Sequence, residues 1–304
     1  MTKIYAIIVT YNALRSDWID KCLKSLASSS ISITPIVVDN GSTDGTREFV
    51  PVHFPNIIWL PQKINIGFGQ ANNIGMRYAL EHDADFVLLL NQDARLHPQA
   101  LEYMIKASDG ISIISPLHMN GDGSEFDHMF QKNTLQCAHN QLYYDLLLGN
   151  QLQDSYPIGE VAAACWLLPV ELIKCIGGFN PLFFQYGEDN NYYQRLLYHH
   201  IDVKLCPKAI MYHDRKQHGD NQMFNMTQFH SSFLLITCNI NLSLPQIIKK
   251  SFQLLIYSYS HGLSSRQYRI GSFGYETIWA FLHLRSILQS RKIEKNIGLN
   301  WLSK

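Results

Sequence analysis

Short apolar runs separated by polar turns recur through the first hundred residues. The run Phe86–Leu90 shows no alternation of apolar and polar positions, which is typical of a strand buried on both faces of a sheet. Apolar residues recur at helical spacing from about Asp17 and again over residues 70–81. The predicted strands are Ile4–Thr10, Ile33–Val38, Ile57–Leu60 and Asp85–Leu90. Strands that alternate with helices predict an α/β fold with a doubly wound, mostly parallel sheet.

Polar residues follow these strands directly. Tyr11-Asn12 comes after the first, the segment from Asp39 to Thr46 after the second, and Asn91-Gln92-Asp93 after the fourth. Right-handed crossovers bring the carboxyl ends of parallel strands to one edge, where open sheets bind ligands. We therefore expect Asp39 and Asp93 in one cleft that holds a nucleotide and a metal. The phosphate-binding pattern G-x-G-x-x-G is missing after the first strand, which argues against a dinucleotide site.

The second half of the chain is less regular. A strand is expected at Ile111–Ser115, and two short strands at Val203–Leu205 and Ala209–Tyr212, on either side of Pro207. The insert at residues 116–157 carries no pattern to which we assign a function.

The tail from residue 221 onward is basic, with nine Lys or Arg residues against two acids. Apolar runs alternate with these cations. Two interpretations of the tail stay open. It consists of helices that pack on the catalytic domain, or it forms a surface whose cations face anionic lipid.

Composition narrows the class of protein. The 304 residues carry 25 basic and 25 acidic side chains, and this balance gives no argument for a nucleic-acid partner. The six cysteines are scattered, without metal-site spacing, and are expected to be reduced thiols. The longest apolar runs are too short to span a membrane. We expect a cytoplasmic protein, with peripheral contact to the inner face of the cell membrane if the tail binds lipid.

Two further positions carry candidate chemistry. Glu188-Asp189 begins a predicted helix after the aromatic loop Phe183–Gly187, so a carboxylate there can accept a proton from an attacking hydroxyl. Simple favourable interaction with the helix dipole is the alternative. His213 ends a predicted strand, and with Asp93 it would suit Mn²⁺ or Mg²⁺. His218 is the competing candidate for this ligand.

Six motifs in this order give the chain a resemblance to a known family. They are I-V-T-Y-N (8–12), V-V-D-N-G-S-T-D-G-T (37–46), N-I-G-F-G-Q-A-N-N-I-G (65–75), L-L-N-Q-D (89–93), G-G-F-N-P-L-F-F-Q-Y-G-E-D (177–189) and the later His213. Over roughly residues 3–215 the sequence resembles the family 2 inverting glycosyltransferases of GT-A fold. Within that family it is most similar to the rhamnosyltransferase-like branch of bacterial surface polysaccharide biosynthesis.

The resemblance implies roles for individual residues. Asp189 would be the general base that deprotonates an acceptor hydroxyl, and Asp93 and His213 would hold Mn²⁺ or Mg²⁺ against the diphosphate. Trp166 and Glu188 would border the acceptor. The nucleotide would be bound by Thr10, Tyr11, Asn12, Asp39, Asn40, Gly41, Asn65, Gly67, Asn73 and Asn91.

The sequence departs from the family at two positions. Gln92 stands where relatives usually have proline, which leaves Asp93 in place. Asn191 stands where relatives often carry a second acid after the E-D pair.

These observations predict an enzyme that transfers a sugar from a UDP- or dTDP-linked donor, such as dTDP-rhamnose, to a saccharide or lipid-linked acceptor. The predicted organisation is a catalytic domain at 1–220 and a helical region at 221–304. Within the catalytic domain, residues 1–115 would bind the nucleotide and residues 116–220 the acceptor. The competing hypotheses are a sugar nucleotidyltransferase and a non-catalytic subunit that binds nucleotide sugars.

Overall fold

The computed structural model describes residues 2–135, 141–214, 226–262, 278–279 and 281–303. A single nine-stranded sheet organises the chain, in the order β3-β2-β1-β4-β8-β6-β9-β5, with β7 paired to β9. The strands are β1 (Ile4–Thr10), β2 (Thr34–Asp39), β3 (Ile58–Trp59), β4 (Phe86–Leu90), β5 (Ala94–Leu96), β6 (Ile113–Asn120), β7 (Tyr156–Ile158), β8 (Cys165–Pro169) and β9 (Val203–His213).

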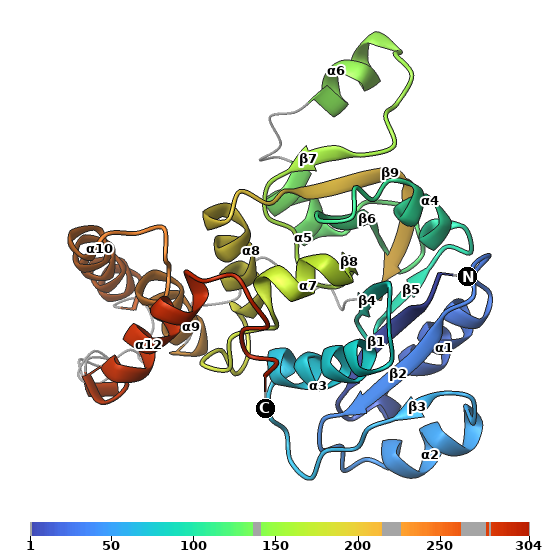
Figure 1. Ribbon diagram of the computed structural model, residues 1–304, viewed down its shortest axis with the longest axis horizontal. Helices are drawn as coiled ribbons and strands as arrows, with labels where there is room; N and C mark the ends of the chain where they lie inside the picture. Colours follow the sequence, from blue (N-terminus) through green and yellow to red (C-terminus); the bar gives the residue numbers. More distant parts are fainter. Residues whose placement is uncertain (1, 136–140, 215–225, 263–277, 280, 304) are drawn as a thin grey trace.

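Helices cover both faces of this sheet, and a helical region lies to one side of it (Figure 1). The α-helices are α1 (Trp18–Ala27), α2 (Thr46–His53), α3 (Phe68–Glu81), α4 (Ala100–Lys106), α5 (His128–Phe130), α6 (Gln141–Leu148), α7 (Val170–Ile176), α8 (Glu188–Tyr198), α9 (Met226–Thr237), α10 (Leu244–Gly262) and α12 (Leu284–Glu294). Two short turns of other helix types are at Ala13–Arg15 and Gln131–Leu135.

The first half of the sheet agrees with the alternating pattern of the sequence. β1 pairs in parallel with both β2 and β4, and β2 with β3. The second half is mixed, because β8 runs antiparallel between β4 and β6 while β6 and β9 are parallel. The expected mostly parallel sheet flanked by helices is confirmed.

One expectation about the strands is wrong. The chain does not break into two short strands around Pro207 but continues as the single strand β9. The pairing of β9 with β6 shifts register between Pro116 and Leu117, opposite the segment that follows Cys206. Proline cannot donate a ladder hydrogen bond, and a local irregularity accommodates it within one strand.

The two faces of the sheet bury separate apolar clusters. Successive residues of β1 point to opposite sides, so that Ile7 packs in one cluster and Ile8 in the other. A third cluster joins the helical region to the loop before α8, through Phe183, Leu234 and Ile287. The helical region is thus attached beside the segment that carries Glu188-Asp189.

Candidate functional site

A cleft of about 290 Å³ lies at the carboxyl ends of the parallel strands. Its size is at the lower end of the roughly 300–1,000 Å³ of small-molecule sites. The side chains that line it come from four strand-end segments and from the loop before α8. They are Val9, Tyr11, Asn40, Asn65, Gly67, Phe68, Asn91, Gln92, Asp93, Phe184 and Gln185.

Asp93 is the acidic residue of this lining. None of the described residues that line the cleft is Lys or Arg. A diphosphate placed here would therefore meet a carboxylate without a cationic side chain to offset it. A divalent cation would supply the missing positive charge.

Gln92 joins the end of β4 to the end of β1. Its Oε1 accepts a hydrogen bond from the Tyr11 backbone N–H at 3.1 Å, and its Nε2 donates to the Tyr11 carbonyl oxygen at 3.4 Å. Proline, the usual residue of relatives at this position, has no side-chain amide to make these bonds. The departure at Gln92 thus adds a direct link between two walls of the cleft.

Asn40 holds the segment at residues 65–67 against the end of β2. Its Nδ2 donates to Asn65 Oδ1 at 3.0 Å, and its Oδ1 accepts from the Ile66 backbone N–H at 2.9 Å. Gly67 has a φ of +87°, and a Cβ there would lie 2.2 Å from the Phe184 carbonyl oxygen. Glycine is required at this position, because the loop before α8 closes directly over it.

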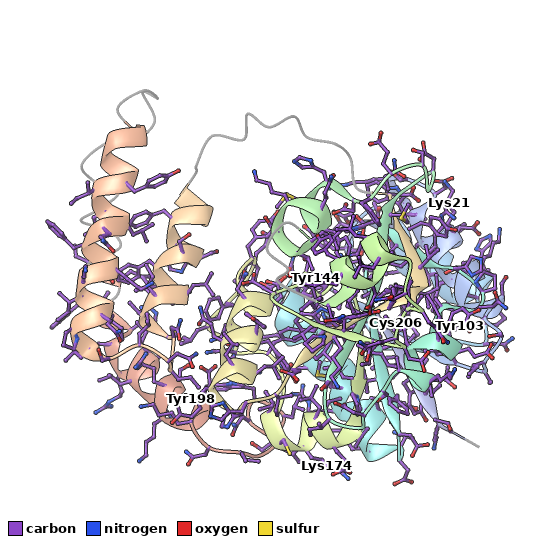
Figure 2. The ribbon with its side chains drawn as sticks, turned by 90° about the horizontal axis from the view of Figure 1, so that it is seen from above. Lys21, Tyr103, Tyr144, Lys174, Tyr198 and Cys206 are labelled. Carbon is purple, nitrogen blue, oxygen red and sulfur yellow. The ribbon has the colours of Figure 1, made fainter. Side chains whose placement is uncertain are left out.

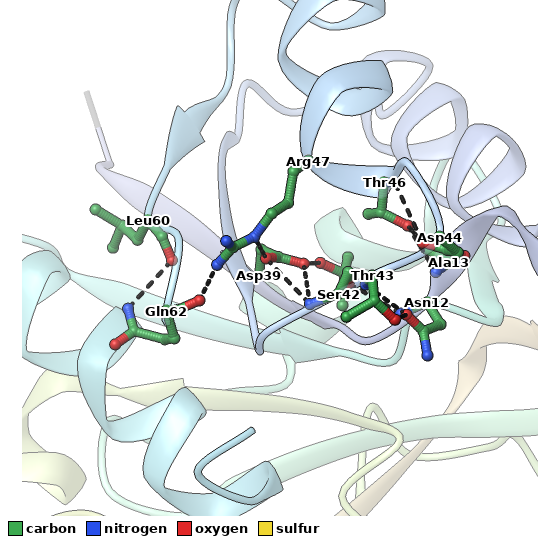
Figure 3. A network of polar contacts seen from close by, with 11 residues as sticks. Asn12, Ala13, Asp39, Ser42, Thr43, Asp44, Thr46, Arg47, Leu60 and Gln62 are labelled. Atoms are coloured by element: carbon green, nitrogen blue, oxygen red, sulfur yellow. Dashed lines mark hydrogen bonds and ion pairs between the residues drawn. The ribbon is translucent and has the colours of Figure 1, made fainter. Parts of the chain in front are cut away.

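Asp39 is fully buried beside the cleft and does not line it. Its Oδ2 lies 2.8 Å from Arg47 Nε (Figure 3). Thr10 Oγ1 donates to its Oδ1 at 3.5 Å. Asn12 has a similar structural role, because its Oδ1 accepts a hydrogen bond from the Thr43 backbone N–H at 2.8 Å. Asp39 also accepts from the Ser42 N–H at 3.4 Å, so Asp39 and Asn12 together shape the turn at residues 40–46, which includes Gly41 at φ +80°. Their contact with a base or ribose stays a prediction.

Asp93 and His213 lie side by side, as the sequence predicts. Ala94 of β5 pairs with His213 of β9, and Asp93 Oδ1 lies 3.3 Å from His213 Nε2. The His213 side chain is 2% exposed and the Asp93 side chain 23% exposed. The Asp93 carboxylate therefore faces the cleft, and the imidazole lies buried behind it. The competing candidate His218 lies outside the described residues.

The structure adds Asp127 to this pair. Its Oδ2 lies 3.7 Å from His213 Nδ1, on the opposite side of the ring from Asp93. Asp127 belongs to the insert at 116–157, and its position in sequence gave no reason to place it beside His213. Pairing of β6 with β9 brings it there, because Asn120 at the end of β6 is in register with His213.

Glu188 and Asp189 occupy the first turn of α8, as expected. The helix follows Gly187 at φ +91° and Tyr186 at φ +66°, an unfavourable conformation for a tyrosine. Asp189 Oδ1 accepts from the Asn190 backbone N–H at 2.9 Å, and Oδ2 from the Ala163 N–H at 3.5 Å. Burial, and then the nearby Asp189 carboxylate, raises the pKa of Glu188 to about 8.

Glu160 is a third carboxylate in this region that sequence reasoning missed. Desolvation, followed by the charge of Asp189, raises the pKa of Glu160 to about 7, although the residue keeps an exposed surface. Its backbone carbonyl oxygen accepts from Thr134 Oγ1 at 3.0 Å. Three acids thus gather at the start of α8, which favours a site for proton transfer.

Asn73 and Trp166 take part in packing. Asn73 is 3% exposed and exchanges two hydrogen bonds with the Phe179 backbone, at 2.7 and 2.8 Å. Trp166 is buried, with its ring 6.2 Å from Phe179 and 5.7 Å from Tyr192. The predicted contacts of Asn73 with nucleotide and of Trp166 with acceptor stay predictions.

Asn191 bonds to an acid from the far end of the chain. Its Nδ2 donates to Glu294 Oε2 at 3.4 Å, and Asn180 Nδ2 donates to Glu294 Oε1 at 2.8 Å. The charge of buried Glu294 also opposes the desolvation that lowers the pKa of Arg195. α12 therefore supplies a carboxylate next to the position where relatives often carry one in the motif itself.

Residues 5–177, more than half of the chain, match the profile of Glycosyl transferase family 2. The chain belongs to this family. It is therefore a glycosyltransferase. Family membership favours sugar transfer over nucleotidyl transfer, the competing activity considered from the sequence.

Curated relatives extend the likeness beyond the family match. The chain is 25% identical over 235 residues to the low-salt glycan biosynthesis hexosyltransferase Agl10 of Haloferax volcanii, which covers 75% of this chain and 70% of that protein. It is 24% identical over 257 residues to the N-acetylglucosaminyl-diphospho-decaprenol L-rhamnosyltransferase of Mycobacterium tuberculosis, over 76% of this chain and 83% of that protein.

Solved structures share the fold. TarS 1-349 of S. aureus in complex with UDP has a TM-score of 0.56 at 15% identity, over 96% of this chain and 81% of that one. The mannosyltransferase PcManGT from Pyrobaculum calidifontis, in complex with GDP-Man and Mn²⁺, has a TM-score of 0.56 at 13% identity, over 96% and 86%. The GT-A fold expected from the sequence is thereby confirmed.

The residues around Asp93 fit a divalent cation. In the described part of the chain no three His, Cys, Asp or Glu side chains form a complete metal site. A carboxylate and an imidazole are nevertheless ligands that Mn²⁺ accepts, and Mg²⁺ and Mn²⁺ sites in nucleotide enzymes commonly draw their other ligands from phosphates and water. His213 Nε2, the ring nitrogen on the side of Asp93, is the one that would face such a cation.

Proposed function

We propose that this glycosyltransferase moves a sugar from a nucleoside diphosphate donor to a hydroxyl of a saccharide acceptor, with inversion at the anomeric carbon. One observation carries the proposal. Asp93, paired with buried His213, faces a cleft whose described lining residues include no Lys or Arg, and the loop that closes this cleft leads directly to Asp189.

Different residues of the cleft would contact different parts of the donor. Tyr11, Asn40, Asn65, Gly67 and Asn91 line the part formed by the strand ends and would contact the nucleoside. Thr10, Asn12, Asp39, Gly41 and Asn73 would support these contacts from behind.

Asp93 and His213 would hold Mn²⁺ or Mg²⁺. When bound, the cation supplies positive charge to the diphosphate leaving group.

Asp189 would act as the base. The acceptor oxygen forms a bond to the anomeric carbon while the bond from that carbon to the diphosphate oxygen breaks. The acceptor proton passes to the Asp189 carboxylate, and the electron pair of the broken bond leaves with the nucleoside diphosphate. A single displacement of this kind inverts the anomeric configuration.

Rhamnose linked to dTDP is our preferred donor, with UDP sugars as the competing class. The support is the name of the mycobacterial relative, which is an L-rhamnosyltransferase. The name of that relative also includes a diphospho-decaprenol, so a lipid-linked saccharide is the acceptor class we favour here.

The parts of the chain would share these tasks. Residues 1–115 would bind the donor, residues 116–220 the acceptor, and the helical region from 221 onward would be the part that meets the membrane.

Helix α10 has the surface that such a membrane contact needs. Leu244, Ile248, Phe252 and Ile256 recur every four residues along it and are between 55% and 67% exposed. The helix carries Lys249 and Lys250 and no acid. Apolar side chains beside cations are typical of helices that lie in an anionic lipid interface.

The position of α10 also suits this contact. The helix stands at the outer side of the helical region, away from the sheet, in both Figure 1 and Figure 2. None of the helices in the described residues is long and apolar enough to cross a membrane.

Vesicle sedimentation tests the membrane contact. Wild-type protein is expected to bind vesicles rich in phosphatidylglycerol and to be released by high salt, because each surface cation contributes about 1 kcal/mol. Replacing both Ile248 and Phe252 by Asp is expected to weaken binding at least about tenfold. Val52→Asp, at an exposed apolar site in α2, is the matched control. Equal binding of the double variant and Val52→Asp would exclude α10 as the docking surface.

Calorimetry tests the donor site. UDP, dTDP, GDP and CMP are titrated with Mn²⁺ and with EDTA into wild-type protein, Asp93→Ala and the exposed control Asp17→Ala. In wild-type protein and Asp17→Ala we expect one diphosphate to bind selectively and only with Mn²⁺. In Asp93→Ala we expect binding to be equally weak with Mn²⁺ and with EDTA. Equal affinity with Mn²⁺ and with EDTA in wild-type protein would overturn the metal-assisted function.

A further inference from the structure

The loop before α8 has one exposed side chain between the donor cleft and Asp189. Gln185 is the last residue of this loop that lines the cleft, and Asp189 lies in the first turn of α8. Between them, Gly187 has no side chain and Glu188 is 7% exposed, whereas Tyr186 is 61% exposed. A molecule that extends along this loop from the cleft to Asp189 would therefore meet the Tyr186 side chain.

The backbone next to Tyr186 is held from behind by the helical region. Phe183 is 1% exposed and packs in one cluster with Leu234 of α9. Ser231, also of α9, donates from its Oγ to the Gln185 carbonyl oxygen at 3.2 Å. The exposure of Tyr186 is thus a property of an anchored loop.

The backbone conformation of Tyr186 is unfavourable for its side chain. Its φ of +66° lies in the left-handed region, which glycine and asparagine adopt at lower cost than a bulky residue. Packing does not explain a tyrosine here, because most of the side chain is exposed. Residues held in such conformations cluster at sites that bind ligands or carry out chemistry. The combination of strain and exposure favours a use of the ring in binding.

We propose that the acceptor saccharide stacks on the ring of Tyr186, beside the Asp189 carboxylate. This inference rests on the proposed function, in which the acceptor hydroxyl contacts both Asp189 and the donor in the cleft. A sugar ring presents C–H groups on one face, and the face of an aromatic ring carries the negative part of its quadrupole. Stacking therefore orients the sugar while the hydroxyls around its rim stay free to reach Asp189.

The same loop indicates which part of a lipid-linked acceptor binds here. Phe184 lines the cleft and is 52% exposed, so a second aromatic side chain lies two residues before Tyr186. Residues 179–187 include no Lys or Arg, and Glu188 and Asp189 follow them directly. Aromatic rings beside carboxylates suit a neutral sugar and disfavour a diphosphate. The saccharide of the acceptor would bind at Tyr186, and its diphosphate would lie elsewhere.

Tyr186→Asn separates this binding role from a structural one. Asparagine adopts the left-handed region readily, so the variant is expected to unfold at the same temperature as wild type or at a higher one. Because the ring is absent, saccharide binding is expected to be about tenfold weaker. Tyr186→Phe keeps the ring and is expected to bind within about twofold of wild type.

Saturation-transfer NMR measures this binding when the aromatic protons of the protein are irradiated. The probes are the methyl glycosides of N-acetylglucosamine, glucose, galactose and rhamnose. Wild-type protein is expected to transfer saturation most strongly to the C–H protons on one face of a probe.

Two control variants should bind the probes as wild type does. Tyr144→Ala removes a ring of α6 that is 65% exposed, and it controls for the loss of a surface tyrosine. His200→Asn changes another exposed residue with positive φ, +56°, shortly after α8, and it controls for the backbone effect.

Three results would overturn the inference. They are no saturation of any probe by wild type, equal binding by wild type and Tyr186→Asn, and a loss in Tyr186→Phe as large as that in Tyr186→Asn, which would assign binding to the hydroxyl. Failure of the proposed function gives a different result. In that case no nucleoside diphosphate shows metal-dependent binding in calorimetry, while saturation of the probes still depends on Tyr186.

Discussion

The donor cleft and the first turn of α8 are built in different ways. The lining of the cleft is assembled from short segments that bind one another mainly through uncharged groups, such as the bonds of Gln92 to Tyr11 and of Asn40 to Asn65, with the Asp39–Arg47 ion pair behind it. The region of Asp189 contains more buried ionisable groups, including Arg195 and Glu294, which come from distant parts of the chain and interact electrostatically.

This difference has an energetic consequence. A neutral hydrogen bond contributes only about 0.5–1.5 kcal/mol, whereas removing one partner of a buried charged pair costs about 3–5 kcal/mol. We therefore expect substitutions around α8 to have larger effects than substitutions in the cleft wall. The following predictions test that order, beginning with the strongest effect.

Replacing Asp189 by Asn should abolish sugar transfer while the donor still binds. The amide cannot accept the acceptor proton, and general-base catalysis typically contributes about 10²–10⁴-fold to the rate. The measurement is turnover beside calorimetric donor affinity, with Glu171→Gln, at an exposed position of α7, as control. Full turnover in Asp189→Asn would assign the base elsewhere, with Glu160 as the next candidate.

Replacing Glu294 by Ala should destabilise the protein by about 3 kcal/mol. The change removes the acceptor of the Asn180 and Asn191 amides and leaves Arg195 without the nearby negative charge. Urea unfolding measures the loss. Glu171→Ala, which breaks an exposed pair with Lys174, should cost less than about 1 kcal/mol. Equal losses in the two variants would contradict the buried role of Glu294.

Replacing Arg47 by Gln should cost about 2 kcal/mol, because Asp39 is buried and loses its ion pair while Arg47 itself is partly exposed. The turn at residues 40–46 should loosen as well, and nucleotide affinity should fall with it. Denaturation and calorimetry report the two effects, and Lys24→Gln, at an exposed position of α1, serves as control. Unchanged stability would show that Asp39 does not need this cation.

Replacing Glu188 by Gln should change how stability depends on pH. The pKa of Glu188 is raised from 4.5 to about 8 on folding, so between these values the folded state binds more protons than the unfolded state. The free energy of unfolding of the wild type therefore falls as pH rises through this window. The variant has no such group, and its stability relative to wild type should rise by more than about 1 kcal/mol from pH 4.5 to pH 8.

Denaturation curves at both ends of this window check the result. Glu171→Gln should show no such trend, since Glu171 is exposed on α7. Parallel pH profiles for wild type and Glu188→Gln would mean that Glu188 is ionised in the folded protein across the window.

Much of the cleft could be predicted from the sequence because its residues follow strands directly. Tyr11, Asn40, Asn91 and Asp93 line it, as the strand-end pattern indicated, and Asn65, which the family resemblance suggested, lines it as well. Asp39 shows the limit of that reasoning. The turn places it at the correct edge, but pairing with Arg47 turns its carboxylate away from the lining.

The second half of the chain could be predicted less well. β8 runs antiparallel between β4 and β6, and β9 continues through Pro207, although short apolar runs had suggested two strands. Strand direction and continuity depend on pairing partners that are distant in sequence. A local pattern of apolar residues contains little information about those partners.

The sequence by itself determined the alternating strands and helices and the polar strand ends. These follow from periodicity and turn chemistry, which act over a few residues. The family resemblance suggested Asp93 and His213 as partners, and pairing of β5 with β9 is what brings them together. Only the tertiary structure decided that Asp127 flanks His213, that Glu160 joins the acids at α8, and that Glu294 meets Asn191. Each of these contacts joins segments far apart along the chain, and burial in a common core is what brings their charges together.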